Sequence, residues 1–156
     1  MFKKIVWATD GSELAERALP FAADLASTPD AELIAVHVNE LLVGRAGGYP
    51  FRADEPEIEH ELETRVGALR ERGVPARLVV ITTGGASTAT AIAEAADTFD
   101  ADVIVIGTHG RGAIASAVLG SVARQLLHKA HRPVLAVPVL HLAEAAVEQP
   151  VGAGSP

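Results

Sequence analysis

The chain has 156 residues, of which 20 are acidic and 13 are basic, giving a formal net charge of −7. This length suits one domain with its own hydrophobic core, and the acidic balance argues against a general nucleic-acid binder, which needs a net basic face. Cysteine is absent, which excludes disulfides, thiolate metal sites and thiol catalysis. No apolar run approaches the roughly 20 residues of a membrane span, so we expect a soluble cytoplasmic protein with no membrane or nucleic-acid partner.

Strand and helix patterns alternate along the chain. Runs of β-branched and aliphatic residues predict strands covered on both faces, because most of these runs are continuously apolar. In chain order, the expected elements are strand Lys4–Thr9, a helix capped by Ser12, strand Glu32–Asn39, helix Glu55–Arg72, strand Ala76–Thr82, helix Ser87–Phe99, strand Asp102–Gly107, helix Ser121–Ala130 and strand Pro133–Val139. This order predicts an α/β fold, a three-layer doubly wound parallel sheet with right-handed crossovers.

Apolar stripes indicate which face of each helix packs inward. We expect Pro20 to bend the first helix, because proline removes a backbone donor. The stripes are Ala15, Ala18, Leu19, Ala22 and Ala26 in the first helix, Ile58, Leu62, Val66 and Leu69 in the second, Ala89, Ile92, Ala93 and Ala96 in the third, and Val122, Ala123, Leu126 and Leu127 in the fourth.

Three further segments stand out by composition. Six of the 20 acids fall between Asp54 and Glu63, and without them 14 acids face 13 bases; we expect this run to be a solvated helix face. The glycine-rich segment Glu40–Ala53 is predicted to be a long loop. We expect residues 1–140 to form the domain and 141–156 a tail, with a short helix at Leu142–Glu148 and disorder at Pro150–Pro156.

The residues with chemical potential fall where the first and fourth strands end. In open α/β sheets, ligands bind beyond the carboxyl ends of the strands, where the strand order reverses. Glycines allow backbone amides to approach a ligand, consecutive amides form a nest for phosphate, and a helix N-terminus favours an anion. These segments are Ala8-Thr9-Asp10-Gly11-Ser12, Gly107-Thr108-His109-Gly110-Arg111-Gly112 and Gly120-Ser121.

From the residues alone, a phosphate site and a glycine-rich turn without a ligand remain alternatives. The Walker pattern is absent, because no Gly-Lys-Ser/Thr follows the loop, and the dinucleotide fingerprint is missing from the first turn. Asp10 is placed to accept from a ribose hydroxyl or to meet a metal bound to phosphate. Arg111 either neutralises a phosphate or is solvated.

The histidines are read individually. His109 either contacts phosphate or ribose, or lies exposed on a loop. His37 is expected to be a satisfied core residue rather than a ligand. His128 and His131 stand three apart without a third ligand in register, which favours a surface position over a metal site.

The spacing Gly107-x2-Gly110-x9-Gly120-Ser121 resembles that of the ATP-binding universal stress protein family. The opening Lys4–Ser12, the second strand Ala31–Val38 with its His37-Val38 ending, and the last strand Arg132–Val137 support the resemblance, which covers about residues 2–139. Trp7 departs from it, since a smaller apolar residue is more usual there.

The resemblance implies a flavodoxin-like (adenine nucleotide alpha hydrolase-like) sheet of five strands in order 3-2-1-4-5, with ATP between strands one and four. Magnesium, where present, would be bound through the phosphates near Asp10, and no metal is expected on side chains alone. The nucleotide-binding residues carried over by position are Ala8, Thr9, Asp10, Val38, Ile106, Gly107, His109, Gly110, Gly120, Ser121 and Val122.

The family further implies a homodimer formed through the last strand, Pro133–Leu140. We expect a nucleotide-responsive regulator of the stress response, with an unidentified protein partner and with segment Glu40–Ala53 as the responsive element. Phosphoryl transfer needs a base, metal ligands and cations, so no dedicated enzyme is expected, while slow ATP hydrolysis or autophosphorylation at Ser121 or a nearby hydroxyl stays open. The alternatives are a nucleotide-independent interaction module and a site that prefers AMP or cyclic AMP.

Overall fold

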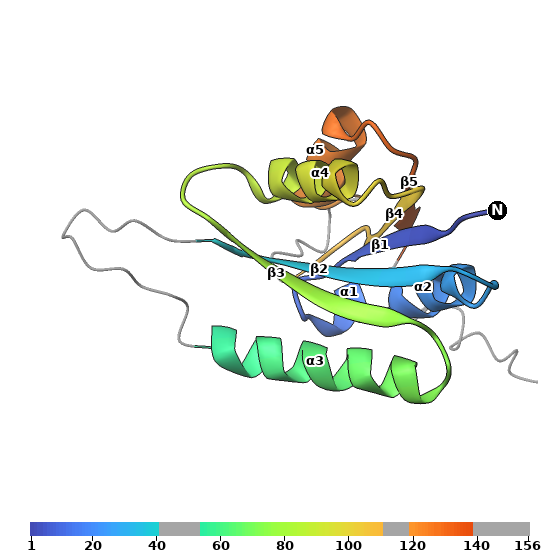
Figure 1. Cartoon of the computed structure of the whole chain (residues 1–156). Coiled ribbons are helices and arrows are strands. Elements are labelled where there is room, and N and C mark those ends of the chain that lie inside the picture. The colour runs from blue at the N-terminus through green and yellow to red at the C-terminus, as the bar shows by residue number, and fades with distance from the viewer. Residues whose placement is uncertain (41–53, 111–118, 139–156) are drawn as a thin grey trace, which may run out of the picture.

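Helices and strands alternate through residues 1–40, 54–110 and 119–138, which are the residues described by the computed structural model (Figure 1). In chain order the elements are β1 Lys4–Ala8, α1 Glu13–Glu16, α2 Leu19–Ala26, β2 Glu32–Glu40, α3 Glu55–Glu71, β3 Ala76–Thr83, α4 Thr88–Thr98, β4 Val103–Gly107, α5 Ser121–Lys129 and β5 Val134–Val137. All strand pairs are parallel, and the sheet order is β3-β2-β1-β4-β5. The predicted α/β fold and strand order are confirmed.

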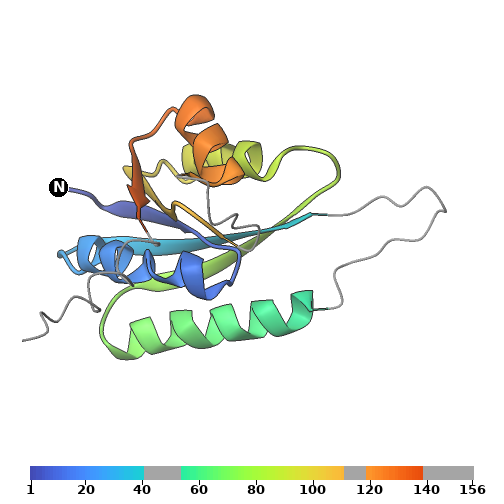
Figure 2. The same ribbon diagram turned by 180° about the vertical axis from the view of Figure 1, so that it is seen from behind.

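The sheet is covered on both faces, with α1, α2 and α3 on one side and α4 and α5 on the other (Figures 1 and 2). Successive strand residues point to opposite faces, so Trp7 and Leu33 pack in the cluster that includes Leu62 of α3, whereas Val6 and Ile34 pack in the cluster that includes Leu126 of α5. All of these side chains are buried. Burial on both faces explains why the strands are continuously apolar.

The first predicted helix is two helices. Ser12 caps α1 as expected, because its Oγ accepts from the Ala15 N–H at 3.2 Å. Pro20 lies in the first turn of α2, where a missing N–H leaves no intrahelical bond unmade. Proline therefore starts a second helix instead of bending a single one.

The inward stripe of α5 is narrower than predicted. Ala123 and Leu126 are buried, but the Leu127 side chain is 48% exposed, so its assignment to the core was wrong. Leu127 follows Leu126 by 100° around the helix, which carries it off the face that packs on the sheet. The stripe of α3 is confirmed, because all four of its predicted residues are buried.

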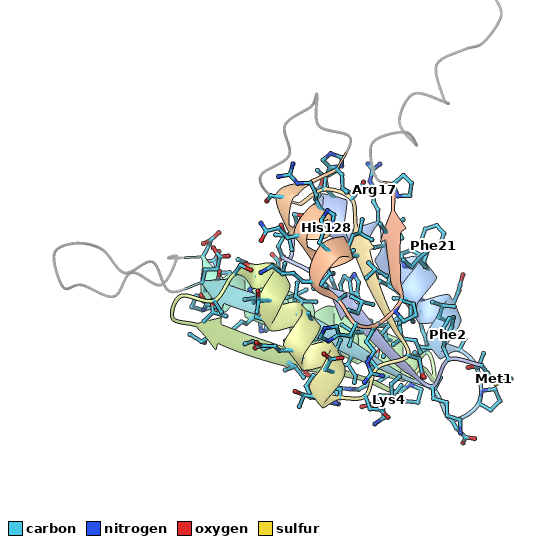
Figure 3. The ribbon with its side chains drawn as sticks, turned by 90° about the horizontal axis from the view of Figure 1, so that it is seen from above. Met1, Phe2, Lys4, Arg17, Phe21 and His128 are labelled. Atoms are coloured by element: carbon cyan, nitrogen blue, oxygen red, sulfur yellow. The ribbon has the colours of Figure 1, made fainter. Side chains whose placement is uncertain are left out.

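Ion pairs, and hydrogen bonds from backbone amides to a carboxylate, connect the elements at the amino-terminal ends of the strands. The Asp102 carboxylate accepts from the backbone amides of Lys3 and Lys4 at 2.7 and 2.8 Å, and these bonds lower the pKa of Asp102. Arg132 donates to Asp97 and forms an ion pair with Asp100, each at 3.0 Å. Met1, Phe2 and Lys4 mark this edge in Figure 3.

Some expectations fall outside the described residues. These are the loop that follows Glu40, Arg111 with Gly112, and the tail with its short helix and disordered end. The division into domain 1–140 and tail 141–156 therefore stays a prediction. Within the described part of the chain, no helix is long and apolar enough to cross a membrane.

Candidate nucleotide site

A cavity of about 400 Å³ opens at the carboxyl ends of β1, β2 and β4, beside the first turns of α4 and α5. The strand order reverses here, because β1 is followed by β2 on one side and borders β4 on the other, and such a switch point is the usual ligand position of the fold. Every residue assigned to a nucleotide from the sequence lines this cavity: Ala8, Thr9, Asp10, Val38, Ile106, Gly107, His109, Gly110, Gly120, Ser121 and Val122.

Further lining residues were not assigned from the sequence. They are Ala15, Thr88, Ile92, Thr108, Leu119, Ala123 and Arg124. Thr88 and Ile92 lie four apart on α4 and so share one helix face; that spacing was visible in the sequence, but the side-by-side position of α4 and the end of β2 was not. Arg124 shares a face with Ser121 for the same reason, at a spacing of three.

The cavity lining combines aliphatic side chains with glycines and polar groups. The aliphatic residues Val38, Ile92 and Val122 come from β2, α4 and α5. Gly110 follows β4, and Ser121 with Arg124 comes from α5. A ligand that carries both an apolar ring and an anionic group matches this mixed lining.

The turn after β1 holds Asp10 in a fixed orientation. Ser12 N–H donates to Asp10 Oδ1 at 3.0 Å, and Gly11 N–H donates to Thr9 Oγ1 at 3.1 Å. Gly11 has φ +75°, a left-handed conformation that favours glycine. The side chain of Asp10 packs so closely on Gly110 that a Cβ at residue 110 would overlap its carboxylate. Gly110 therefore preserves the position of Asp10 across the cavity.

Thr108 and His109, which directly follow β4, are buried. Thr108 N–H donates to Val137 O at 2.9 Å, and Gly120 N–H donates to Thr108 O at 2.6 Å. Thr108 and His109 are 9% and 4% exposed, with Thr108 Oγ1 3.1 Å from His109 Nδ1. The exposed-loop alternative for His109 is thereby excluded.

Gly120 brings the first turn of α5 against this segment. It is the N-cap residue and makes no side-chain cap, and the first amides of a helix have no intrahelical acceptor. A Cβ at Gly120 would lie 2.9 Å from Thr108 O, which is too close for a backbone neighbour. A substitution such as Gly120→Val would therefore displace the backbone of the site as well as fill it.

A buried pair lies behind the turn after β1. His37 Nδ1 is 3.0 Å from Thr9 O, and His37 Nε2 is 2.8 Å from Glu55 Oε2, with His37 and Glu55 only 2% and 5% exposed. A carbonyl only accepts, so Nδ1 carries a hydrogen, and the second bond needs one more proton on either Nε2 or the Glu55 carboxyl. His37 is thus a satisfied core residue, as expected.

Glu55 corrects the interpretation of the acidic run. It was expected to be solvated with its neighbours, but it is the first residue of α3 and there it contacts His37 of β2. Glu57, Glu61 and Glu63 are exposed as expected.

His128 and His131 lie at the surface, as expected. His128 projects from the surface of α5 (Figure 3), and His131 pairs with Asp97 at 3.0 Å. Within residues 1–40, 54–110 and 119–138, no three acidic or histidine side chains are grouped as metal ligands. Asp10 is the carboxylate that lines the cavity, so a magnesium ion would need phosphate oxygens for most of its shell.

The comparisons with known proteins point to one family. The model of the universal stress protein family matches residues 1–138. A universal stress protein from Thermus aquaticus is 37% identical over 139 residues, which cover 88% of this chain and 99% of that protein. Mycobacterial universal stress proteins are 36% identical over 129 residues, and the chain spans 42% of their length.

Solved structures agree in fold. The universal stress protein from Archaeoglobus fulgidus in complex with dAMP is 29% identical, with a TM-score of 0.63 and coverage of 88% of this chain and 98% of that one. A universal stress protein in complex with cAMP is 27% identical, with the same TM-score and the same coverage.

Proposed function

The chain belongs to the universal stress protein family, and from that premise we propose that its cavity binds ATP. The observation that carries this proposal is the mixed lining of the cavity: aliphatic side chains such as Val38 and Ile92, together with glycines and the first turn of α5. Adenine packs against Val38 and Ile92, and the phosphates lie at the glycines and at the first turn of α5.

Each group of lining residues has a role in this arrangement. Val38 contacts the adenine through its backbone, and Asp10 accepts from a ribose hydroxyl. The amides of Gly110, Ser121 and Val122 donate to phosphate oxygens at the start of α5, where the helix dipole favours an anion. Magnesium, when bound, neutralises phosphate charge, and Asp10 is the side chain that would reach it.

Adenine nucleotides in two neighbours support the ligand class. The dAMP complex of the Archaeoglobus protein and the cAMP complex both hold an adenine base and a phosphate. They also favour a second candidate, a site that prefers AMP or cyclic AMP over ATP. Phosphate number is the difference between the two candidates.

We further propose that the protein is a homodimer and a regulator. In the described sheet β5 is an edge strand that pairs with β4 alone, and Leu135 on it is 40% exposed. A second copy pairing along Pro133–Leu140 would cover this edge; residues 139 and 140 lie outside the described part. Nucleotide occupancy would shift the population of conformations and so signal to a partner protein in the cytoplasm during stress, without dedicated catalysis.

Two measurements test nucleotide binding. Mass spectrometry of the protein purified under native conditions identifies any nucleotide that accompanies it, and we expect ATP. A thermal unfolding series with ATP, AMP and cyclic AMP should then show stabilisation, about 2.7 kcal/mol at a ligand concentration 100 times Kd.

Both measurements can contradict the proposal that the cavity binds ATP. No copurifying nucleotide together with no shift at millimolar concentrations of all three ligands would leave an interaction module that works without nucleotide. Stabilisation by AMP or cyclic AMP but not by ATP would select the second candidate.

A further inference from the structure

We propose that Arg124 makes the cavity selective for nucleoside polyphosphates over monophosphates. The inference rests on the proposed function, since it concerns the ligand of the same cavity. It assigns a specificity-determining role to a residue outside the glycine pattern that carried the family resemblance.

The position of Arg124 on α5 directs its side chain toward the cavity. It lies three residues after Ser121, so the two residues share a helix face. Helical side chains point back toward the N-terminus of their helix and cover the preceding turn. Arg124 lines the cavity and remains exposed, which places a long cationic side chain at the open rim beside Ser121.

The electrostatic setting of Arg124 is unfavourable without an anion. Arg124 is the fourth residue of α5, so its positive charge lies near the positive end of the helix dipole, and the first turn of α5 contains no acidic residue. Arg65, Arg70, Arg77 and Arg132 each pair with a carboxylate, but no residue in the described part of the chain forms an ion pair with Arg124. An anionic ligand at the start of α5 removes this conflict.

Because Arg124 lies at the open rim of the cavity, it distinguishes ligands by their number of phosphates. The phosphate attached to ribose lies between the ribose, which is held at Asp10, and the free amides at the start of α5. Additional phosphates extend outward from the floor, toward the exposed face of α5. A guanidinium there gains charge-assisted, bidentate hydrogen bonds with those outer phosphates and gains little with AMP.

Isothermal titration with ATP, ADP and AMP tests the assignment on the full chain. In Arg124→Gln we expect the Kd of ATP to rise about 10-fold, the factor for loss of one hydrogen bond to a charged group, while the Kd of AMP changes less than about 2-fold. Arg124→Lys should retain part of the ATP affinity, because it keeps the charge and loses the fork. Added salt should weaken ATP binding less in Arg124→Gln than in the unaltered protein.

Arg72→Gln is the matched control. Arg72 is exposed at the end of α3, outside the cavity lining, so this variant makes the same change in net charge and should leave all three Kd values unchanged. The melting temperature without nucleotide should not fall in Arg124→Gln, because the side chain opposes the dipole of its own helix.

The outcomes separate the two proposals. An Arg124→Gln variant that binds ATP as tightly as before, or that loses AMP and ATP affinity equally, overturns the inference and leaves adenine-nucleotide binding intact. An unaltered protein that binds none of the three nucleotides overturns both.

Discussion

The amino-terminal and carboxyl-terminal ends of the strands differ in the residues that surround them. At the amino-terminal edge, carboxylates such as Asp102 and Asp97 bind backbone amides and Arg132. At the carboxyl edge, Gly110 and Gly120 allow close backbone approach, and a cavity remains between the strand ends. We call the amino-terminal ends of the strands, where charged side chains bind one another and backbone amides, the closed edge. We call the carboxyl ends, where glycines surround the cavity, the open edge.

This difference separates stability from binding. Side chains that pair with one another at the amino-terminal edge lower the free energy of the folded chain, whereas backbone amides at the carboxyl edge retain capacity for a ligand. The buried His37–Glu55 pair is the exception, because it anchors the open edge from behind through Thr9 O. Substitutions at the two edges should therefore affect different measurements.

The largest expected effect comes from substitution of Glu55, which removes the buried His37–Glu55 pair. Glu55→Leu leaves His37 Nε2 buried without a partner, and an unpaired buried polar group costs about 1–3 kcal/mol. Glu55→Gln should cost much less, because its amide donates to Nε2 while Nδ1–H still donates to Thr9 O. Urea unfolding measures both variants, and imidazole ¹⁵N NMR should show Nε2 as an acceptor in Glu55→Gln. Equal losses in the two variants would contradict the hydrogen-bond assignment.

A second substitution breaks binding at the open edge. Gly110→Ala puts a methyl group against the Asp10 carboxylate, so we expect Asp10 to shift and ATP to bind about 10- to 100-fold more weakly, since a hydrogen bond to a charged group is lost. Titration calorimetry measures the loss.

Gly67→Ala supplies the control for that substitution. Nothing lies within 4 Å of a Cβ at this position in α3, so the change should raise the free energy of unfolding by about 0.5–1 kcal/mol and leave ATP affinity unchanged. Unaltered affinity in Gly110→Ala would mean that Asp10 does not contact the nucleotide.

The smallest expected effect concerns the closed edge and depends on pH. The amides of Lys4 and Lys3 lower the pKa of Asp102 in the folded chain, so its ionised form stabilises the fold above the unfolded-state value of about 3.9. The advantage over Asp102→Asn should be constant from about pH 5 to pH 8. It should shrink as pH falls below about 4, through the lowered folded-state pKa. Thermal unfolding across this range measures the difference, which would grow with acid if the sign were reversed.

Local patterns predicted most of the fold. Apolar runs, most of them continuous, located all five strands, because both faces of the sheet are covered, and a stripe at helical spacing located α3. The glycine spacing and the family resemblance together named residues that the fold brings to one cavity. Those residues lie beside glycines and strand ends, which are features of local sequence.

What escaped prediction depends on contacts between distant segments. Glu55 is predicted to be solvated because its neighbours in sequence are acidic. Its burial is favourable only because it pairs with His37, 18 residues earlier. Leu127 fits an apolar pattern, but it lies 100° around α5 from the buried Leu126 and so points away from the sheet. Arg124 carries no motif, and its place in the lining follows from where α5 starts. Pro20 shows a local limit too, since a proline that bends a helix and one that starts a helix look alike in sequence.

Trp7 gives the molecule an internal spectroscopic reporter. It is the single tryptophan of the chain, it is fully buried on the α2 and α3 face, and its indole Nε1 has no hydrogen-bond partner in the described structure. An indole in such surroundings emits at short wavelength and shifts to the red when water reaches it. Its emission therefore follows the opening of the layer opposite α4 and α5, so unfolding can be timed optically in every variant above without a label.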